Sequence, residues 1–292
     1  MLSDTTIAIV TKKRPIELGR CLQSIFHQTK QPSSVIVIDN DIEKSAQEIT
    51  TNQKFSTLQI KYHYYNDTVP ACRNLAMQLC KSRHLGFVDD DCVLNRNWLA
   101  NGLKLLEREK LDFVLGTTKL YNPQNVLARA QHQRDAYWKK YNGMIFDTKN
   151  VLFSLDQIKK AKLQFDESCQ SSFYDSADFD FDFQIHEANL KGVNSPKMIL
   201  HHQETNNLRR FLKRAYHRGK LAHYLDHKWQ LEGKLSADGD ANFLWWIARS
   251  VKNFLRLKKQ YRSSTLETLV IRLFDHYYAL GYQAAHNNYV KK

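Results

Sequence analysis

An apolar run that ends in three consecutive aspartates constrains this chain most. Residues 85–88 (Leu-Gly-Phe-Val) predict a short buried strand, and Asp89, Asp90 and Asp91 follow it directly. Open α/β sheets bind their ligands at the carboxyl ends of their strands. Three adjacent carboxylates repel one another, whereas a divalent cation with a diphosphate would relieve that repulsion, since hard cations take oxygen ligands and bridge phosphates. The alternative interpretation is an acidic turn that caps a helix beginning near Asn97.

The composition limits the class of protein. With 292 residues, 42% of them hydrophobic, the chain can bury one large core and an appended segment. Its five cysteines form no C-x-x-C pair, so we expect reduced thiols in a cytosolic protein rather than a disulfide framework or a zinc site. The N-terminus lacks the regions of a secretory signal, and no apolar run approaches the ~20 residues that span a bilayer.

The net charge of +13 is unevenly distributed. Residues 205–292 contain 17 Lys and Arg against 6 Asp and Glu, whereas residues 1–204 contain 26 against 24. We therefore expect two domains, a near-neutral body over residues 1–204 and a basic extension over residues 205–292. Such an extension favours contact with a polyanion, for example a membrane surface, an anionic glycan or nucleic acid. A helical bundle with solvated basic faces is the alternative.

Strand and helix signals alternate through the body. Apolar or alternating runs predict strands over residues 6–10, 35–38 and 58–64, and amphipathic patterns predict helices that begin at Pro15 and Pro70. This order predicts an α/β fold with a parallel, doubly wound sheet. The turn after the first strand contains no glycine, which excludes a G-x-G-x-x-G dinucleotide site, and no Walker A sequence occurs. A nucleotide would therefore be held by carboxylates and a metal.

Several stretches of the body follow one another in a characteristic order. They are residues 6–29 (TIAIVTKKRPIELGRCLQSIFHQT), 35–40 (VIVIDN), 70–74 (PACRN) and 87–99 (FVDDDCVLNRNWL). Together they resemble glycosyltransferase family 2 of the GT-A fold, over roughly residues 5–204. The resemblance implies a Rossmann-like, mostly parallel GT-A sheet, with the basic segment as a helical extension. It further implies metal-dependent, inverting transfer of a sugar from a nucleotide sugar to a glycan hydroxyl.

The resemblance also implies which residues hold the donor and its metal. Mn²⁺ or Mg²⁺ would bind Asp89 and Asp91 together with a histidine after the last strand, either His201 or His202, although an ordinary pair of strand-end histidines is the alternative. The expected donor is a UDP sugar. Its contacts are implied for seven residues: Thr11, Arg14, Asp39, Asn66, Arg73, Asp89 and Asp90.

A second acidic stretch, residues 176–181, takes the place of the family's catalytic motif. Residues 165–167 (Phe-Asp-Glu) resemble the segment that precedes this motif in the family. The register implies that Asp178 is the catalytic base and that Asp180 is the motif's second acid. Asn189 stands eleven residues after Asp178, and Asn commonly replaces Gly in the left-handed conformation that ends a helix.

Two positions depart from the family's pattern. Ala177 replaces a usual Glu, and Gln184 stands where an Arg is common, which leaves open the contacts that those residues would make. Asp175 and Asp182 compete with the assigned base. Because aspartates and phenylalanines alternate over residues 178–183, an acidic strand is the alternative to a helix start.

The basic extension predicts three helices. Residues 208–218 form an amphipathic pattern that stops at Gly219, and residues 266–285 form a less charged one. Between them, Trp245 and Trp246 belong to a helix that mixes aromatic residues with Lys and Arg, a pattern typical of a membrane interface. We therefore expect a peripheral protein at the cytoplasmic face of an anionic membrane. Burial of the two tryptophans against the body is the alternative.

Two functions of different classes stay open. The first is a glycosyltransferase that acts on a lipid-linked or cell-surface glycan of the polysaccharide, lipopolysaccharide or teichoic-acid type, with no nucleic acid as partner. The second is a non-catalytic protein that binds a polyanion or a membrane on a decayed transferase scaffold. It would bind with a steep salt dependence and would not respond to Mn²⁺. A nucleotidyltransferase is disfavoured, because the Gly-rich loop and Lys that it needs after the first strand are absent.

Overall fold

The computed structural model describes residues 3–142, 146–171, 174–175, 177–236 and 243–290. Side chains are described for these residues except 138–142, 170–171, 174–175, 243–251 and 289–290. The chain divides into two compact units. The first unit comprises residues 1–121, 144–167 and 177–203, and the second comprises residues 122–143, 168–176 and 204–292.

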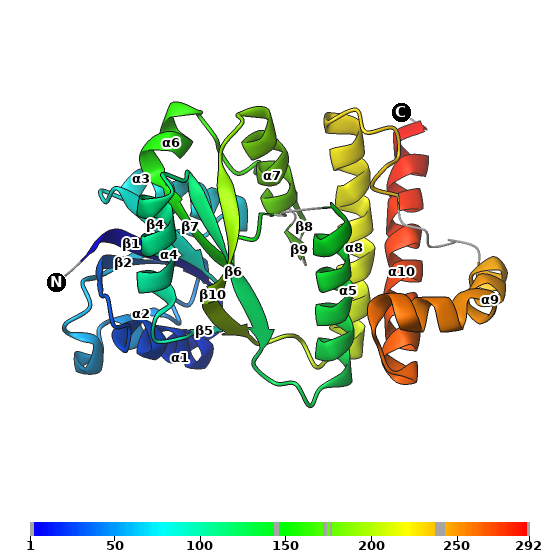
Figure 1. Cartoon of the computed structure of the whole chain (residues 1–292), viewed down its shortest axis with the longest axis horizontal. Helices are drawn as coiled ribbons and strands as arrows, with labels where there is room; N and C mark the ends of the chain where they lie inside the picture. The colour runs from blue at the N-terminus through cyan, green and yellow to red at the C-terminus, as the bar shows by residue number, and fades with distance from the viewer. Residues whose placement is uncertain (1–2, 143–145, 172–173, 176, 237–242, 291–292) are drawn as a thin grey trace. The chain divides into compact units, whose positions relative to one another are not determined.

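The first unit contains a mixed sheet with the strand order β3-β2-β1-β4-β7-β6-β10-β5 (Figure 1). Parallel pairing joins β1 to β2 and β4, β2 to β3, and β6 to β10, whereas β7 runs antiparallel to β4 and β6, and β5 antiparallel to β10. The predicted α/β fold is confirmed. The strands are β1 (Ser3–Thr11), β2 (Pro32–Asp39), β3 (Ile60–Tyr64), β4 (His84–Val88), β5 (Cys92–Leu94), β6 (Phe113–Leu120), β7 (Asn150–Ser154) and β10 (Gly192–His202).

The helices of this unit begin where local sequence signals place them. Pro15 occupies the first turn of α1, and Thr68 caps α3 by accepting a hydrogen bond from the backbone N–H of Ala71 at 3.1 Å. The helices are α1 (Pro15–Phe26), α2 (Gln47–Thr50), the 3₁₀ helix η1 (Gln53–Phe55), α3 (Val69–Leu79), α4 (Trp98–Arg108), α6 (Leu155–Lys160) and α7 (Ala177–Glu187).

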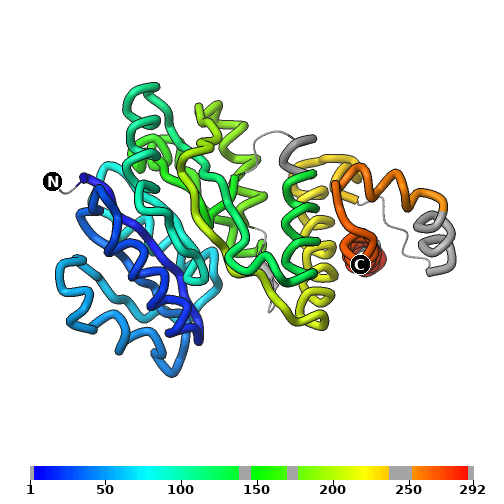
Figure 2. The backbone as a smooth tube through the Cα atoms, turned by 60° about the horizontal axis from the view of Figure 1, so that its bottom comes forward, coloured from blue at the N-terminus to red at the C-terminus, as the bar shows by residue number. Residues whose placement is uncertain are grey.

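The core of the first unit joins helices to the sheet. Helix α1 lies beside β1 (Figure 2). Leu18 and Leu22 of α1 share one cluster with Ile7 and Ile9 of β1, and all four side chains are fully buried. Apolar side chains of α4 belong to the same cluster. All five cysteines of the chain are also buried. This packing fixes the strand ends at which the sequence places its candidate site.

The acidic triplet does not cap α4. Strand β5 lies between the triplet and the helix, and the N-cap residue of α4 is Asn97. The capping interpretation of the triplet is therefore wrong, and its three carboxylates need another explanation.

The second unit is helical and also contains a short hairpin. Its elements are α5 (Val126–Asn142), β8 (Gln170–Ser171), β9 (Tyr174–Asp175), α8 (Leu208–Lys228), α9 (Phe243–Tyr261) and α10 (Thr265–Val290). A buried ion pair links α5 to α10, because Arg134 Nε donates to Asp275 Oδ1 at 3.0 Å and the guanidinium lies over the ring of Phe274. No helix among the described residues combines the length and apolar character needed to cross a bilayer.

Helices α8 and α10 lie side by side and run in the same general direction (Figure 1). Phe211 of α8 contacts Phe274 of α10 in the first halves of the two helices. His223 contacts His286 in the last halves. The predicted stop at Gly219 is wrong, since α8 continues through it to Lys228. A Cβ atom on Gly219 would collide with the backbone of α10. Glycine is therefore needed here for close helix packing and not for a helix end.

We expect Gly219→Ala to lower the free energy of unfolding by about 1–3 kcal/mol, because overpacking forces the two backbones apart. Gly19→Ala in α1 is the matched control. A Cβ atom there meets only the flexible side chain of Ile49 at 3.3 Å, and alanine gains up to ~1 kcal/mol of helix propensity. Urea denaturation followed by circular dichroism measures both. Equal stability of the two variants would contradict the close contact.

Candidate active site

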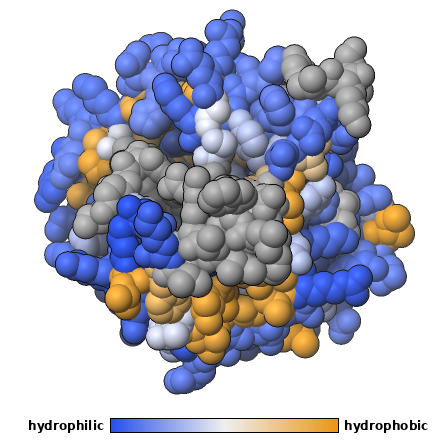
Figure 3. All heavy atoms as spheres, turned by 90° about the vertical axis from the view of Figure 1, so that its right-hand side faces the viewer, coloured by the Kyte–Doolittle hydropathy of each residue, from blue (hydrophilic) through white to orange (hydrophobic). Residues whose placement is uncertain are grey.

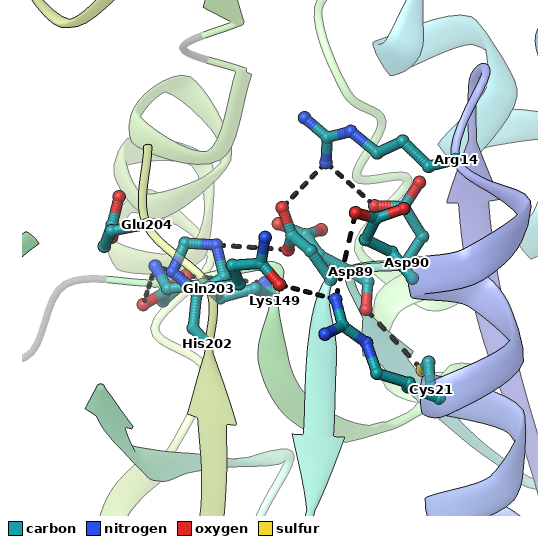
Figure 4. Close-up of polar contacts among 12 residues, drawn as sticks. Arg14, Cys21, Asp89, Asp90, Lys149, His202, Gln203 and Glu204 are labelled. Atoms are coloured by element: carbon teal, nitrogen blue, oxygen red, sulfur yellow. Dashed lines mark hydrogen bonds and ion pairs between the residues drawn. The ribbon is translucent and has the colours of Figure 1, made fainter. Parts of the chain in front are cut away.

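Asp90 lies at the centre of the candidate site (Figure 4). Its carboxylate is almost fully buried; Thr11 Oγ1 donates to one oxygen at 2.7 Å and Arg14 Nη1 donates to the other at 2.9 Å. The same guanidinium donates to Asp91 Oδ2 at 2.7 Å. Thr11 ends β1 and Arg14 precedes α1, so these contacts bring together three of the residues that the sequence assigns to donor binding.

Burial decides the ionisation of this cluster. It raises the pKa of Asp90 to about 7, although the charge of Arg14 acts in the opposite direction. Burial acts to lower the pKa of Arg14, but the carboxylates of Asp90 and Asp91 outweigh it and raise that pKa above its ordinary value. The guanidinium therefore stays charged and balances part of the negative charge of the triplet.

Arg73 faces the first aspartate of the triplet. Its Nη2 lies 3.9 Å from Asp89 Oδ1, and its guanidinium lies over the ring of Phe165. The neighbouring Asn74 is buried and hydrogen-bonds both the N–H and the carbonyl of Phe165, each at 2.9 Å. The PACRN segment therefore fixes the start of the Phe-Asp-Glu segment, at residues 165–167, beside the triplet.

The third aspartate meets a histidine of the last strand. His202 Nε2 lies 3.2 Å from Asp91 Oδ1, and the backbone N–H of Gln203 donates to the Asp91 carbonyl at 3.1 Å. Successive strand residues point to opposite faces, so His201 projects away from Asp91. The structure thus brings His202, and not His201, to the triplet.

The potential metal ligands around Asp91 suit a divalent cation. Ligand atoms of Asp91, His202 and Cys92 all lie within 4.8 Å of one another. Burial raises the pKa of the Cys92 thiol well above its usual value. Hard cations also prefer oxygen ligands to sulfur, so Cys92 is disfavoured as a ligand for Mn²⁺ or Mg²⁺. The carboxylate and the imidazole that remain fit Mn²⁺ or Mg²⁺ completed by phosphate and water oxygens.

The second acidic stretch forms the start of α7, which excludes the strand alternative. Asp178 and Asp180 lie in the first turn, and Asn189 adopts the predicted left-handed conformation after the helix, with φ of 53°. Phe181 is fully buried and stacks on Phe165 with ring centroids 4.4 Å apart. The contact with Phe165 therefore anchors α7, and the aspartates of the helix lie in different surroundings.

The three aspartates of α7 differ in their surroundings. Asp180 is fully buried and accepts a hydrogen bond from Gln184 Nε2 at 2.7 Å. Asp182 accepts from the backbone N–H of Phe146 at 2.7 Å, and burial raises its pKa. Asp178 is partly exposed, and its carboxylate contacts Thr148 Oγ1 at 3.4 Å. The side chain of the competing Asp175 lies outside the described residues.

Lys149 is a site residue that the sequence did not indicate (Figure 4). Its ammonium group donates to both carboxylate oxygens of Asp147, at 2.8 and 2.7 Å, and its charge acts on Asp89. An isolated lysine before a strand carries no recognisable pattern, so only the fold reveals its place. With Arg14 and Arg73 it adds positive charge around the triplet.

The two remaining residues that are predicted to bind the sugar donor lie near β2 and β3. Asp39 is fully buried at the end of β2, and it accepts hydrogen bonds from the N–H groups of Asp41 and Ala46 and from the hydroxyl of Tyr62. These bonds organise the connection that follows β2. Asn66 is exposed between β3 and α3. Contact of either residue with a nucleotide stays a prediction.

Comparison with known proteins agrees with this architecture. The family model described as glycosyl transferase family 2 matches residues 6–173. The glycosyltransferase AglE of Haloferax volcanii is 27% identical over 121 residues, which cover 39% of this chain and 39% of AglE. The chain therefore matches about two fifths of the length of this relative.

Solved structures share the fold. A mannosyltransferase of Pyrobaculum calidifontis, PcManGT, in complex with GDP-Man and Mn²⁺, gives a TM-score of 0.63 at 14% identity and covers 96% of this chain and 87% of its own. TarS of S. aureus gives 0.56 at 15% identity and covers 98% of this chain but 55% of its own. TarS 1–349 in complex with UDP-GlcNAc gives 0.55 at 14% identity, covering 98% and 91%. These likenesses establish a GT-A type fold.

Mn²⁺ binding should distinguish the two adjacent histidines. We expect His202→Asn to weaken it by at least the ~10- to 100-fold that the loss of a supporting residue costs a metal site. His201→Asn is the matched control and should bind Mn²⁺ like the unchanged protein, because its side chain points to the other face of the sheet. Isothermal titration with Mn²⁺ and UDP measures both. A larger loss in His201→Asn would contradict the geometry at Asp91.

Proposed function

The chain belongs to glycosyl transferase family 2, and from that premise we propose that it transfers a sugar from a nucleotide sugar to a hydroxyl of a glycan acceptor. The observation that carries the proposal is the 3.2 Å contact between Asp91 and His202 beside two further aspartates at a strand end. A decayed, non-catalytic scaffold would not need to retain this set of charged groups. The acids and the histidine therefore favour the enzyme over a binding protein.

The surroundings of the triplet suit a nucleoside diphosphate sugar. Arg14, Arg73 and Lys149 supply positive charge around carboxylates that can hold a divalent cation. Bound by Asp89, Asp91 and His202, Mn²⁺ or Mg²⁺ would neutralise the charge that develops on the leaving diphosphate. We propose a UDP sugar as donor; related folds have been solved with UDP-GlcNAc and with GDP-Man.

Asp178 is the proposed base. A base must reach the acceptor hydroxyl, and Asp178 is partly exposed, whereas Asp180 is fully buried. Asp180 would instead position the start of α7 through its bond to Gln184. A hydroxyl deprotonated by Asp178 would attack the anomeric carbon from the face opposite the leaving diphosphate. This single displacement inverts the anomeric configuration.

The acceptor is proposed to lie at an anionic membrane surface, as a lipid-linked or cell-surface glycan. Trp245 and Trp246 fall outside the described side chains, so the support comes from the later part of α9. Leu257 and Tyr261 of that helix are buried in a cluster with Ala130 and Ile271. The apolar face of this part therefore serves the protein's own core and leaves the opposite face to solvent.

That exposed face of α9 is basic. Lys252, Arg256 and Lys259 are exposed at helical spacing, and Leu255 among them is 79% exposed. Figure 3 views the side that carries α9 and shows apolar side chains gathered among hydrophilic ones. Cations of this kind are attracted to anionic lipid headgroups. We propose peripheral contact at the inner face of the membrane through this basic face.

We expect Asp178→Asn to lower turnover by about 10²- to 10⁴-fold, the usual contribution of a positioned base, with little change in donor affinity. Asp182→Asn is the matched control on the same helix; its amide oxygen can still accept from Phe146, so turnover should stay near normal. Initial rates with a UDP sugar and calorimetric UDP binding measure both effects. A larger loss of turnover in Asp182→Asn would move the base to that residue.

Charge reversal on α9 tests the membrane proposal. The triple variant Lys252→Glu, Arg256→Glu and Lys259→Glu should reduce binding of the whole chain to phosphatidylserine vesicles at low salt by at least ~5-fold per cation, since each contributes ~1 kcal/mol. Co-sedimentation measures the bound fraction.

The control makes the same change of net charge on α4 and on the turn that follows it. Lys104→Glu, Arg108→Glu and Lys110→Glu alter exposed residues of the first unit and should leave vesicle binding largely intact. If both triple variants lose binding equally, the net charge and not the face of α9 is responsible. The proposed membrane face would then be wrong.

A further inference from the structure

Cys92 places a sulfur atom beside the carboxylate and the imidazole at the end of the last strand. It begins β5 and pairs directly with His202 of the antiparallel β10. Residues that stand opposite each other in an antiparallel pair project their side chains to the same face of the sheet. Ligand atoms of Asp91, Cys92 and His202 accordingly lie within 4.8 Å of one another. These three residues therefore offer one oxygen, one sulfur and one nitrogen to a single cation.

The separation of these atoms is close to that in a tetrahedral zinc site. Zn²⁺ binds sulfur at about 2.3 Å and nitrogen or carboxylate oxygen at about 2.0–2.2 Å, so its ligand atoms lie ~3.3–3.7 Å apart. Nε2 of His202 is 3.2 Å from Oδ1 of Asp91. The sulfur lies within 4.8 Å of the ligand atoms of both residues. Small side-chain rotations would therefore bring all three atoms to bonding distance of one Zn²⁺ ion.

A cation can reach these residues from solvent. The side chains of Asp91 and His202 are 13% and 12% exposed, whereas Cys92 is fully buried in the core of the first unit. Arg14 Nη1 donates to Asp91 Oδ2, which leaves Asp91 Oδ1 on the side of His202. Supporting contacts of this kind orient the ligands of metal sites. The cation would thus enter past the carboxylate and the imidazole and meet the sulfur last.

The sulfur decides which cations can use all three ligands. Thiolates select Zn²⁺ and softer cations, whereas Mn²⁺ and Mg²⁺ prefer oxygen and would leave Cys92 unused. Three protein ligands with a fourth position left open is a known arrangement for Zn²⁺. When the cation binds, the S–H bond of Cys92 breaks, its electron pair forms the bond from Sγ to the metal, and the proton passes to solvent.

We propose that Asp91, Cys92 and His202 bind Zn²⁺, with the fourth position left to water or to a phosphate oxygen, and that this Zn²⁺ excludes Mn²⁺ from Asp91 and His202. The exclusion rests on the proposed function, in which those two residues hold the cation of the donor. Binding of Zn²⁺ itself does not rest on it. Cys92 thus makes the candidate active site sensitive to zinc without serving the cation that sugar transfer would use.

Titration of the whole chain with Cd²⁺ tests the sulfur ligand directly. Cd²⁺ accepts the same ligands as Zn²⁺, and a thiolate bound to it gives an ultraviolet charge-transfer band that carboxylates and imidazoles do not give. We expect one equivalent of Cd²⁺ to produce this band and Cys92→Ser to abolish it. Cys169→Ser, at another buried cysteine, is the matched control and should retain the band. A band that persists in Cys92→Ser overturns the proposal.

A second substitution guards against a folding defect. Serine places a hydroxyl in the apolar core around Cys92, whereas Cys92→Ala removes the sulfur without adding a polar atom. Both variants should lose the Cd²⁺ band, and circular dichroism reports whether each is folded. A folded Cys92→Ala variant that keeps the band rejects Cys92 as a ligand.

Calorimetry distinguishes the two cations. Cys92→Ser should lower the affinity for Zn²⁺ by at least ~10-fold and leave the affinity for Mn²⁺ in the presence of UDP unchanged, whereas His202→Asn should weaken the binding of both. An equal loss of Zn²⁺ and Mn²⁺ affinity in Cys92→Ser would show a purely structural role for the cysteine and would reject the inference.

Competition between the cations is measured separately. Zn²⁺ should release bound Mn²⁺ from the unchanged protein, which electron paramagnetic resonance detects, and at least ~10-fold more Zn²⁺ should be needed in Cys92→Ser. Release at the same Zn²⁺ concentration in both proteins contradicts the proposed exclusion. If the chain binds Cd²⁺ through Cys92 but binds no Mn²⁺ with UDP, the proposed function fails and the zinc site stands.

Discussion

The buried carboxylate of Asp90 is the group on which the candidate active site depends. Its bonds to Thr11 and Arg14 tie the end of β1 and the start of α1 to the end of β4, so that the flanking Asp89 and Asp91 have fixed positions. A buried charge persists only with a partner, and removal of one member would leave the other uncompensated. The middle aspartate therefore anchors the triplet to β1 and to the start of α1, and it fixes the backbone positions of Asp89 and Asp91.

Aromatic packing fixes the position of α7, which carries the second acidic stretch of the candidate site. Phe87, immediately before the end of β4, meets Phe165 edge-on, and Phe165 stacks on Phe181 of α7. Asn74 clamps the backbone of Phe165 from α3. Segments that are far apart in the sequence are thus held together, as the proposed placement of a base against an acceptor would require.

The four strands over residues 6–10, 35–38, 58–64 and 85–88, and the aspartate triplet, could be predicted because their signals are local. A buried run such as residues 35–38 has one periodicity. The sequence left His201 and His202 as alternatives, and only the pairing of β10 with β5 brings His202 to Asp91. Lys149 could not be found, since only the antiparallel β7 brings it to the triplet. The predicted helix end at Gly219 was wrong because a glycine in a helical pattern locally indicates a stop. Close packing against α10 overrides that local preference.

The common direction of α8 and α10 has an electrostatic consequence. Each helix carries a macrodipole with partial negative charge at its C-terminal end, and two helices that run the same way bring these ends together without the cancellation of an antiparallel pair. His223 and His286 lie in this negative region, where a cation is favoured and an anion is not. The ammonium group of Lys228 in the last turn of α8 offsets part of this negative charge, so a basic residue at this end favours the parallel arrangement of the two helices.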